Sequence, residues 1–508
     1  MMARSRSSPL HIRSNLDNSA DDPQNAQLLL DSLTIPSRIS SIHLAVGDSP
    51  VATALMKSLL DLMVESMPIL RSLEIHYHTP GIEELYLPED FLGRDAPLLT
   101  RLVLKRCELS WKSPLLKNLT SLIIQRSELA FLPFFGLYPT ITQFLLALQQ
   151  MPALEELQLD SCLPRGWAAI ARNIEDCQMI VTLPRLRYLR LSSSVHDCAH
   201  VMDHLSFPAS TTLHVACDDP ERHAPSFFTS IHKILNPLTS SGQRLTKTLL
   251  FSTLARPEYL RLNIWRDGAI PRSHIFPLVS MGEDVDDLQV PDFHLEIDWE
   301  PPDDLDGPDE DQFPSLDGIV EQCVKSLRCD QLETVCMEAG LCDVDEMTIA
   351  DCFGSIQTLQ RVILIRGCAH DWVDAFGTEP CYDEGCQECS KRTVLADDSK
   401  TLDDSKPLGW HVSFPSLRTL ELVFVDLSKR VETIHGMFAM SVLDAMLESW
   451  CILEPLKPLE SLMLWESPGM TSDVEQTLNM MVSWGYVKRI QLEGENWEGE
   501  NWESEDSE

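Results

Sequence analysis

A recurring spacing of leucines restricts the fold of this chain more than any other feature of its sequence. Segments 99–109 and 119–129 share the frame L-x-x-L-x-[L/I]-x-x-[C/S]-x-L and start twenty residues apart. In repeats with this spacing, each unit contributes one short strand to a parallel sheet, and neighbouring units stack to bury a continuous core. The three apolar positions recur at Leu70, Leu73, Ile75; Leu154, Leu157, Leu159; Leu186, Leu189, Leu191; Leu417, Leu420, Leu422; and Leu459, Leu462, Leu464.

Weaker copies keep the spacing when other apolar residues replace leucine. They are Ile39, Ile42, Leu44; Tyr259, Leu262, Ile264; Val290, Phe293, Leu295; Leu332, Val335, Met337; Leu359, Val362, Leu364; Val487, Ile490, Leu492; and Ser210, Leu213, Val215. Proline precedes many copies, as at Pro68, Pro97 and Pro152. Since proline lacks an N–H and ends a preceding helix, it suits the turn before each strand. We therefore predict an α/β fold, an irregular leucine-rich-repeat solenoid or horseshoe, with a curved parallel sheet on its concave side and helices or loops on its convex side.

Helical spacing of apolar residues appears in several connectors between the predicted strands. We expect helices over 51–67, 140–151, 440–453 and 473–484, with Thr140 and Asp473 as N-caps.

The spacing between repeats is uneven, and two long insertions interrupt the second half of the chain. The expected segments are an N-terminal part (1–34), repeats (35–265), an acidic proline-rich insertion with one strand (266–318), repeats (319–365), a cysteine-containing insertion (366–412), repeats (413–492) and an acidic disordered tail (493–508).

The charge of the chain restricts its partners. It has 508 residues with 78 acidic and 40 basic side chains, a formal net charge of −38. Such a charge repels nucleic acid and anionic lipid, so we expect neither as a partner. A protein partner with a basic patch fits better. No stretch approaches the roughly 18 apolar residues of a membrane span.

Cysteine usage and the first residues point to a reducing compartment. The 15 cysteines form no obvious disulfide framework, and segment 1–14 has arginines and serines but no apolar core of a secretory signal. We expect a cytoplasmic or nuclear protein, with an organellar transit peptide as the alternative. Cys386 and Cys389 form a C-x-x-C pair that Cys381 with His370 or Cys368 could complete as a zinc site. Without a second such pair we expect an ordinary polar loop; structural zinc and a redox pair remain the alternatives.

The sequence offers no motif of a known catalytic or nucleotide-binding site. It lacks G-x-S-x-G, the P-loop, H-E-x-x-H and G-x-G-x-x-G. His43, His76 and His214 fall on predicted strand positions that face outward, where contact with a partner or solvent is more common than catalysis. We therefore expect no enzyme and no catalytic, cofactor or metal site.

Alternation along the predicted strands assigns a binding face. The leucines point inward, so the residues between them point to the concave side. Aromatic and arginine side chains supply much of the binding energy at protein interfaces. The candidate partner-binding residues are Arg101, Lys105, Glu156, Gln158, Tyr188, Arg190, Trp265 and Trp465.

A family resemblance suggests a biological context for this face. The A-R-S-x-x-x-P-L segment from Ala3 to Leu10, the segment Ser41-Ile42-His43-Leu44, the Pro-x-Leu-x-x-Leu-x-Leu units and the repeat cysteines Cys107 and Cys162 together resemble the region downstream of the F-box in fungal F-box leucine-rich-repeat proteins. The resemblance implies the substrate-recognition part of a cullin-RING ubiquitin ligase. No helical segment beginning Leu-Pro-x-Glu stands at the start of the chain. A Skp-type adaptor is thus expected only if an F-box lies upstream, and a free-standing repeat scaffold or regulator is the alternative.

Overall fold

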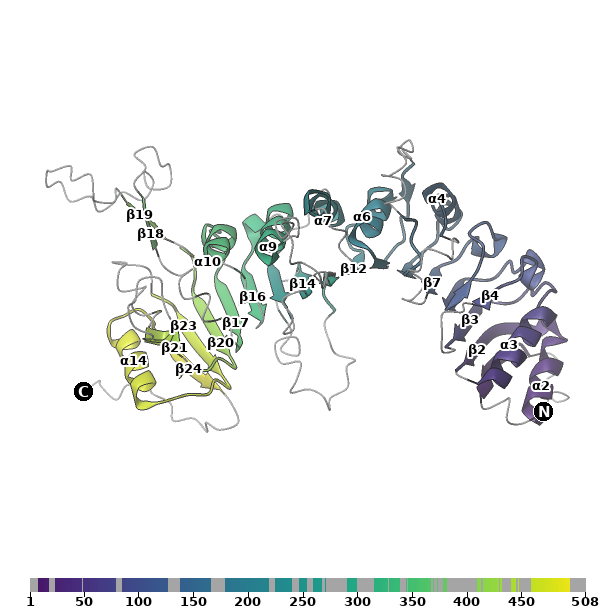
Figure 1. The fold of residues 1–508 in the computed structure, drawn as a ribbon, viewed down its shortest axis with the longest axis horizontal. Coiled ribbons are helices and arrows are strands. Elements are labelled where there is room, and N and C mark those ends of the chain that lie inside the picture. Colours follow the sequence, from purple (N-terminus) through teal and green to yellow (C-terminus); the bar gives the residue numbers. More distant parts are fainter. Residues whose placement is uncertain are drawn as a thin grey trace, which may run out of the picture. The chain divides into compact units, whose positions relative to one another are not determined.

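The repeated leucines build a mixed α/β structure with a large, mostly parallel sheet (Figure 1). The structure is a computed structural model that describes residues 8–17, 23–47, 49–78, 85–126, 138–165, 179–218, 224–239, 246–253, 259–266, 270, 290–298, 315–327, 329–338, 344, 346–366, 369, 372, 378–381, 409–412, 414–428, 430–431, 440–444, 446 and 458–493. The chain divides into two compact units, the first comprising residues 1–237 and 297–299 and the second comprising the remainder.

Eight parallel strands form the sheet of the first unit in the order β1-β2-β3-β5-β7-β8-β10-β12. They are β1 (Leu10–Asn15), β2 (Ile39–Val46), β3 (Ser72–Tyr77), β5 (Arg101–Lys105), β7 (Ser121–Gln125), β8 (Glu156–Asp160), β10 (Tyr188–Ser193) and β12 (Thr212–Asp218). The second apolar position of each repeat pairs in register with that of the next repeat. The residues at this position in four successive repeats are Leu73, Leu102, Leu122 and Leu157. All four are fully buried, so the spacing of the leucines defines the core.

Helices and turns connect these strands. They are α2 (Pro23–Leu33), η2 (Pro36–Arg38), α3 (Pro50–Leu62), η3 (Phe91–Arg94), η4 (Pro114–Leu116), α4 (Ile141–Gln149), α6 (Val195–Asp203) and α7 (Ala224–Thr239), with short paired strands β4 (Leu85–Tyr86), β6 (Cys107–Glu108), β9 (Val181–Thr182) and β11 (Leu205–Ser206). Helix α3 buries Met56, Leu59 and Leu60 in the core. The helical segment expected over 51–67 is therefore present but ends at Leu62.

The second unit orders its strands β15-β14-β13-β16-β17-β20-β23-β24. They are β13 (Thr248–Ser252), β14 (Tyr259–Trp265), β15 (Phe293–Asp298), β16 (Thr334–Glu338), β17 (Arg361–Ile365), β20 (Thr419–Val423), β23 (Ser461–Trp465) and β24 (Ile490–Glu493). Around them lie α9 (Leu316–Ser326), η8 (Cys329–Gln331), α10 (Glu346–Ile349), the π-helical turn η9 (Ala350–Gly354) and α14 (Ser472–Ser483), with the antiparallel pairs β18 (Thr378–Cys381) with β19 (Gly409–Val412) and β21 (Arg430–Val431) with β22 (Met440–Ser441).

One strand of this unit runs against the predicted direction. Strand β14, which contains the Tyr259 copy of the spacing, pairs antiparallel with β13. The expectation of a parallel strand there was wrong, because a connection of only six residues between Ser252 and Tyr259 is too short for a parallel crossover. Strands β1 and β13 were not expected from the sequence at all.

A left-handed residue follows several strands at the same place in the repeat. Arg106, Ser161, Arg366, Phe424 and Glu466 each lie one position after the end of a strand and have φ between 45° and 62°. The N–H of Arg106 donates to the Gln125 carbonyl at 2.6 Å, and that of Ser161 donates to the Ser192 carbonyl at 2.8 Å. The strained backbone thus adds one hydrogen bond to the neighbouring strand before the chain turns away.

Two predicted N-caps have different outcomes. The Thr140 hydroxyl accepts from the Gln143 N–H while the Gln143 side chain accepts from the Thr140 N–H, which is a complete capping box. Asp473 does not cap α14; the Thr471 hydroxyl accepts from the Val474 N–H, and Asp473 lies in the first turn. The helix expected over 440–453 starts later than predicted: residues 440–441 form β22, residues 442–444 and 446 are helical, and 445 and 447–453 lie outside the described residues.

The described part of the chain contains no helix with both the length and the apolar character that crossing a bilayer requires.

Candidate functional site

The first unit carries a polar face on the side of its sheet opposite the buried leucines. We define the polar face as the residues that alternate with the core positions on β2, β3, β5, β7, β8 and β10. Registered pairing arranges them in three rows across the strands. The first row holds Ser41, Ser72, Arg101, Ser121, Glu156 and Tyr188; the second holds His43, Glu74, Val103, Ile123, Gln158 and Arg190; and the third holds Ala45, His76, Lys105, Gln125, Asp160 and Ser192.

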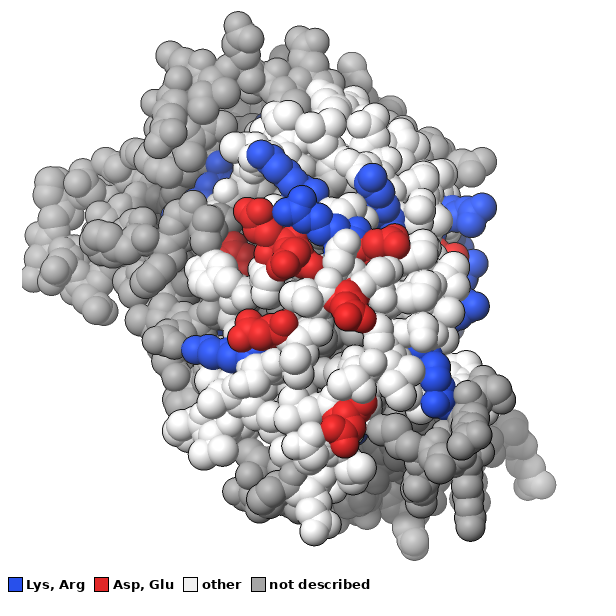
Figure 2. All heavy atoms as spheres, turned by 90° about the vertical axis from the view of Figure 1, so that its right-hand side faces the viewer, with Lys and Arg blue, Asp and Glu red and all other residues white. Residues whose placement is uncertain are grey.

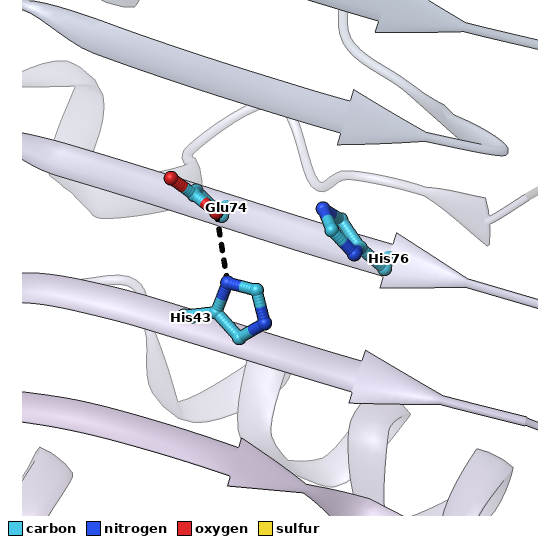
Figure 3. Close-up of side chains that lie close together, drawn as sticks. All are labelled: His43, Glu74 and His76. Atoms are coloured by element: carbon cyan, nitrogen blue, oxygen red, sulfur yellow. Dashed lines mark hydrogen bonds and ion pairs between the residues drawn. The ribbon is translucent and has the colours of Figure 1, made fainter. Parts of the chain in front are cut away.

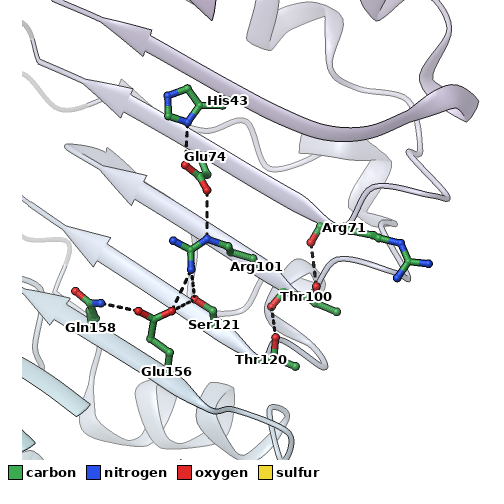
Figure 4. Close-up of polar contacts among 9 residues, drawn as sticks. All are labelled: His43, Arg71, Glu74, Thr100, Arg101, Thr120, Ser121, Glu156 and Gln158. Atoms are coloured by element: carbon green, nitrogen blue, oxygen red, sulfur yellow. Dashed lines mark hydrogen bonds and ion pairs between the residues drawn. The ribbon is translucent and has the colours of Figure 1, made fainter. Parts of the chain in front are cut away.

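A continuous hydrogen-bonded ladder crosses five strands of the polar face (Figure 4). His43 Nδ1 lies 2.8 Å from Glu74 Oε2, and Arg101 Nε donates to Glu74 Oε1 at 3.2 Å. The same guanidinium donates through Nη1 to Glu156 Oε2 at 3.0 Å. Gln158 Nε2 then donates to Glu156 Oε1 at 2.7 Å. Arg101 on β5 therefore bridges Glu74 on the adjacent strand β3 and Glu156 on β8, two strands away on the other side.

The ladder keeps Glu74 ionised. Partial burial acts to raise the pKa of Glu74, but hydrogen bonds from His43 and Arg101 and the positive charge of Arg101 outweigh it, so the pKa lies below its ordinary value. Arg101 is 41% exposed and Glu74 24% exposed, so the pair is only partly removed from water. The ladder fixes the side chains of the polar face more than it adds to stability.

Beside the ladder lies a depression of about 290 Å³. Val103 and Ile123, from the second row, give it apolar lining where longer polar side chains stand on either side. The remaining lining residues are Glu74, His76, Arg101, Lys105, Ile124, Gln125, Gln158, Leu159, Asp160 and Arg190. An apolar centre with a rim of charges and amides is the arrangement by which proteins hold a partner's side chain and fix its orientation.

Two cations of this rim remain available for a ligand. Lys105 forms no ion pair within the described part of the chain, and the described partner of Arg190 is the neutral Tyr188 hydroxyl. His76 adds no charge at neutral pH. Burial, together with the charges of Lys105, His43 and His78, lowers its pKa to about 4. The depression can therefore accept a carboxylate beside Lys105.

The predicted site residues separate into two groups. Arg101, Lys105, Gln158 and Arg190 line the depression, and Glu156 and Tyr188 adjoin it in the first row. Val103 and Ile123 were missing from the predicted set; the signal that could have found them is a β-branched apolar residue at a polar-face position.

The two tryptophans lie in the second unit and do not join this site. Trp265 is 2% exposed and packs in a core cluster with Leu250, Ile270, Ile363 and others. The expectation that Trp265 offers a surface anchor was wrong, because apolar residues occupy the alternate positions of the neighbouring strands and enclose the indole. Trp465 is partly buried and packs against the same cluster.

Charge is unevenly divided along the chain. Residues 1–237 contain 20 basic and 25 acidic side chains, whereas residues 238–508 contain 20 basic and 53 acidic. On the end of the molecule shown in Figure 2, basic and acidic side chains are interspersed. The strongly acidic character of the chain thus belongs mostly to its second half, and the polar face of the first unit is nearly balanced.

Seven of the described cysteines are buried, and Cys352 is partly exposed. None of these eight forms a disulfide bond: Cys107, Cys162, Cys198, Cys217, Cys323, Cys329, Cys336 and Cys352. Burial raises the pKa of Cys323, Cys329 and Cys352 to about 12, which keeps them protonated. Of the predicted zinc candidates, Cys368, His370, Cys386 and Cys389 lie outside the described residues, as does the tail from 494, and Cys381 is described as part of β18.

No protein-family model matches this sequence, and the search of curated proteins finds no match either.

Proposed function

We propose that this chain is an irregular leucine-rich-repeat solenoid that acts as a protein-interaction module, with its partner held on the polar face of the first unit. The in-register burial of Leu73, Leu102, Leu122 and Leu157 supports the repeat architecture, since each unit packs on the next. The observation that carries the binding function is the depression with Val103 and Ile123 inside a charged rim.

The chemistry of the depression defines the partner segment that fits it. Ile123, which is partly exposed, would contact a small apolar side chain above the buried Val103, and Lys105 and Arg190 would pair with a carboxylate near it. Arg101 is already bound to Glu74 and Glu156, so it acts as a fixed part of the wall. The acidic surface of the second half would favour a partner with basic patches elsewhere.

A double substitution tests this surface. We expect Lys105→Glu with Arg190→Glu to abolish partner capture, because two cations on the rim become anions that repel the partner's carboxylate. The matched control is Lys112→Glu with Lys117→Glu, which makes the same charge change at exposed lysines away from the depression. Quantitative affinity purification followed by mass spectrometry checks the result. Equal loss of partners from both double variants, or from neither, would contradict the proposal.

The resemblance to fungal F-box leucine-rich-repeat proteins supports a more specific proposal, that the bound protein is a substrate of a cullin-RING ubiquitin ligase. The second candidate is a scaffold or regulator without a ligase link. Affinity purification of the gene product, with any upstream coding sequence restored, separates the two. Recovery of a Skp-type adaptor supports the ligase receptor, whereas a stable partner with no ligase subunit supports the scaffold.

A further inference from the structure

Three side chains that can bind a metal ion converge at one end of the ladder (Figure 3). His43 comes from β2, and Glu74 and His76 come from alternate positions of β3, so all three project from the polar face. One ligand atom from each lies within 4.8 Å of the others. The His43 and His76 rings meet edge to face with their centroids 5.0 Å apart.

One atom of this cluster lacks a partner that its position calls for. His76 Nε2 is shielded from solvent and forms no hydrogen bond with any described group. Buried polar atoms in folded proteins usually have a partner, so this imidazole nitrogen is placed to bind a ligand atom from outside the described groups.

We propose that His43, Glu74 and His76 form a binding site for a divalent transition-metal ion, with Zn²⁺ as the best fit. Two imidazoles and one carboxylate are a donor set that zinc accepts with tetrahedral geometry, at about 2.0–2.2 Å from each ligand atom. Ligand atoms in such a site stand about 3.3 Å apart. His43 Nδ1 and Glu74 Oε2, now 2.8 Å apart, would separate slightly, and His76 would move closer by rotation of its side chain.

The residues around the three ligands favour metal binding and indicate where a fourth ligand would bind. Arg101 holds Glu74 Oε1 and leaves Oε2 for the metal, which is how outer residues orient a ligating carboxylate. Lys105 lies directly across from His76 on the adjacent strand and also lines the depression. Its charge opposes a bare dication and favours an anionic fourth ligand, so we infer that a carboxylate completes the site from the depression side.

This inference does not depend on the proposed function, because metal binding and partner binding are measured separately. The probe is Zn²⁺ alone, titrated calorimetrically into the full chain carrying Cys386→Ser and Cys389→Ser, so that the C-x-x-C pair does not contribute. We expect His43→Ala and His76→Ala each to weaken binding about tenfold or more, since each removes one of three ligands. The matched control is His232→Ala on α7, an exposed histidine outside the polar face, which should leave binding within about twofold.

Two further measurements keep the test decisive. Co²⁺ bound in place of zinc should give a visible spectrum of nitrogen and oxygen ligands without a thiolate charge-transfer band. Lys105→Gln should tighten binding of the bare ion, because it removes the neighbouring positive charge. Circular dichroism confirms folding, and Glu74→Gln replaces any alanine variant that fails to fold. Equal binding by His76→Ala and the parent chain, equal loss in His232→Ala, or a thiolate band would each overturn the site.

Discussion

At the scale of single residues, two ion pairs of the second unit differ in burial, and so the loss of a partner has different consequences in each. In the second unit, Arg361 Nε donates to Glu421 Oε1 at 2.6 Å, and the Glu421 side chain is only 4% exposed. Arg418 and Glu460 form a pair that is more than half exposed, with 3.7 Å between nitrogen and oxygen. A buried carboxylate that loses its cation cannot be solvated, whereas an exposed one can.

We therefore expect Arg361→Met to destabilise the protein by about 3 kcal/mol, because it leaves the Glu421 carboxylate buried without its partner. The double variant Arg361→Met with Glu421→Met should recover most of that loss, since it removes both charges. Arg418→Met, the control at the exposed pair, should cost less than about 1 kcal/mol. Urea unfolding followed by tryptophan fluorescence measures all three. A double variant as unstable as Arg361→Met would show that the pair is not the cause.

A second residue-scale prediction concerns acid stability. Hydrogen bonding from His294 and Tyr259 and the charge of Arg261 outweigh burial and lower the pKa of Glu296 to about 2. The unfolded chain takes up this proton near the ordinary value of 4.5. The contribution of Glu296 to stability is thus complete above about pH 5 and is lost as pH falls toward 2.

Glu296→Gln should accordingly be about 2 kcal/mol less stable than the parent chain at pH 7, and the difference should shrink as the pH falls below about 5. Urea unfolding at a series of pH values checks this. Glu460→Gln, at an exposed carboxylate, serves as the control and should differ little from the parent chain at any pH. A difference for Glu296→Gln that stays constant from pH 7 to pH 3 would contradict the assignment.

At the scale of the element, several strands are followed by a residue with a left-handed backbone conformation, which the sequence does not predict. Glu466 is exposed and follows β23 with φ 45°, a conformation that costs a residue with a Cβ about 1 kcal/mol. Glu466→Gly should stabilise the protein by about 0.5–1 kcal/mol, because glycine adopts this backbone without steric cost. Glu466→Ala keeps the Cβ and should give no such gain. Thermal unfolding compares the two, and equal effects would mean that the lost carboxylate, not the backbone, is responsible.

The repeat spacing predicts the strands and the faces of their side chains, but not which side chains of neighbouring strands meet. The strands could be predicted because a period of two places Leu102 and Leu104 on one face wherever β5 pairs. The same alternation correctly put Arg101 and Lys105 on the polar face. The convergence of His43, Glu74 and His76 could not be predicted, since it depends on the register between β2 and β3. The prediction for Trp265 was wrong because alternation along one strand cannot show that its neighbours in the second unit are apolar on that face of the sheet too.

At the scale of the whole molecule, the order of strands implies that stability is local. Apart from the β13–β15 segment, strands in each unit pair mostly with the strand before and the strand after them. Leu122 and Leu364 are fully buried core leucines in different units, on β7 and β17 respectively. Each Leu→Ala change should cost about 3 kcal/mol through the cavity that it leaves. Because coupling in such an array passes between neighbours, the loss should not spread evenly.

We expect Leu122→Ala to raise amide hydrogen exchange most strongly in β5, β7 and β8, the strands that contain or flank the cavity, with little change in β16 and β17. Leu364→Ala should give the reverse pattern, which makes each variant the control for the other. Hydrogen exchange read by mass spectrometry resolves these segments under native conditions. Uniform acceleration throughout the chain in both variants would mean that the two units unfold as one cooperative structure. Segment-specific acceleration would instead mean that the two units open independently. A partner bound to the polar face of the first unit would then stabilise that unit alone.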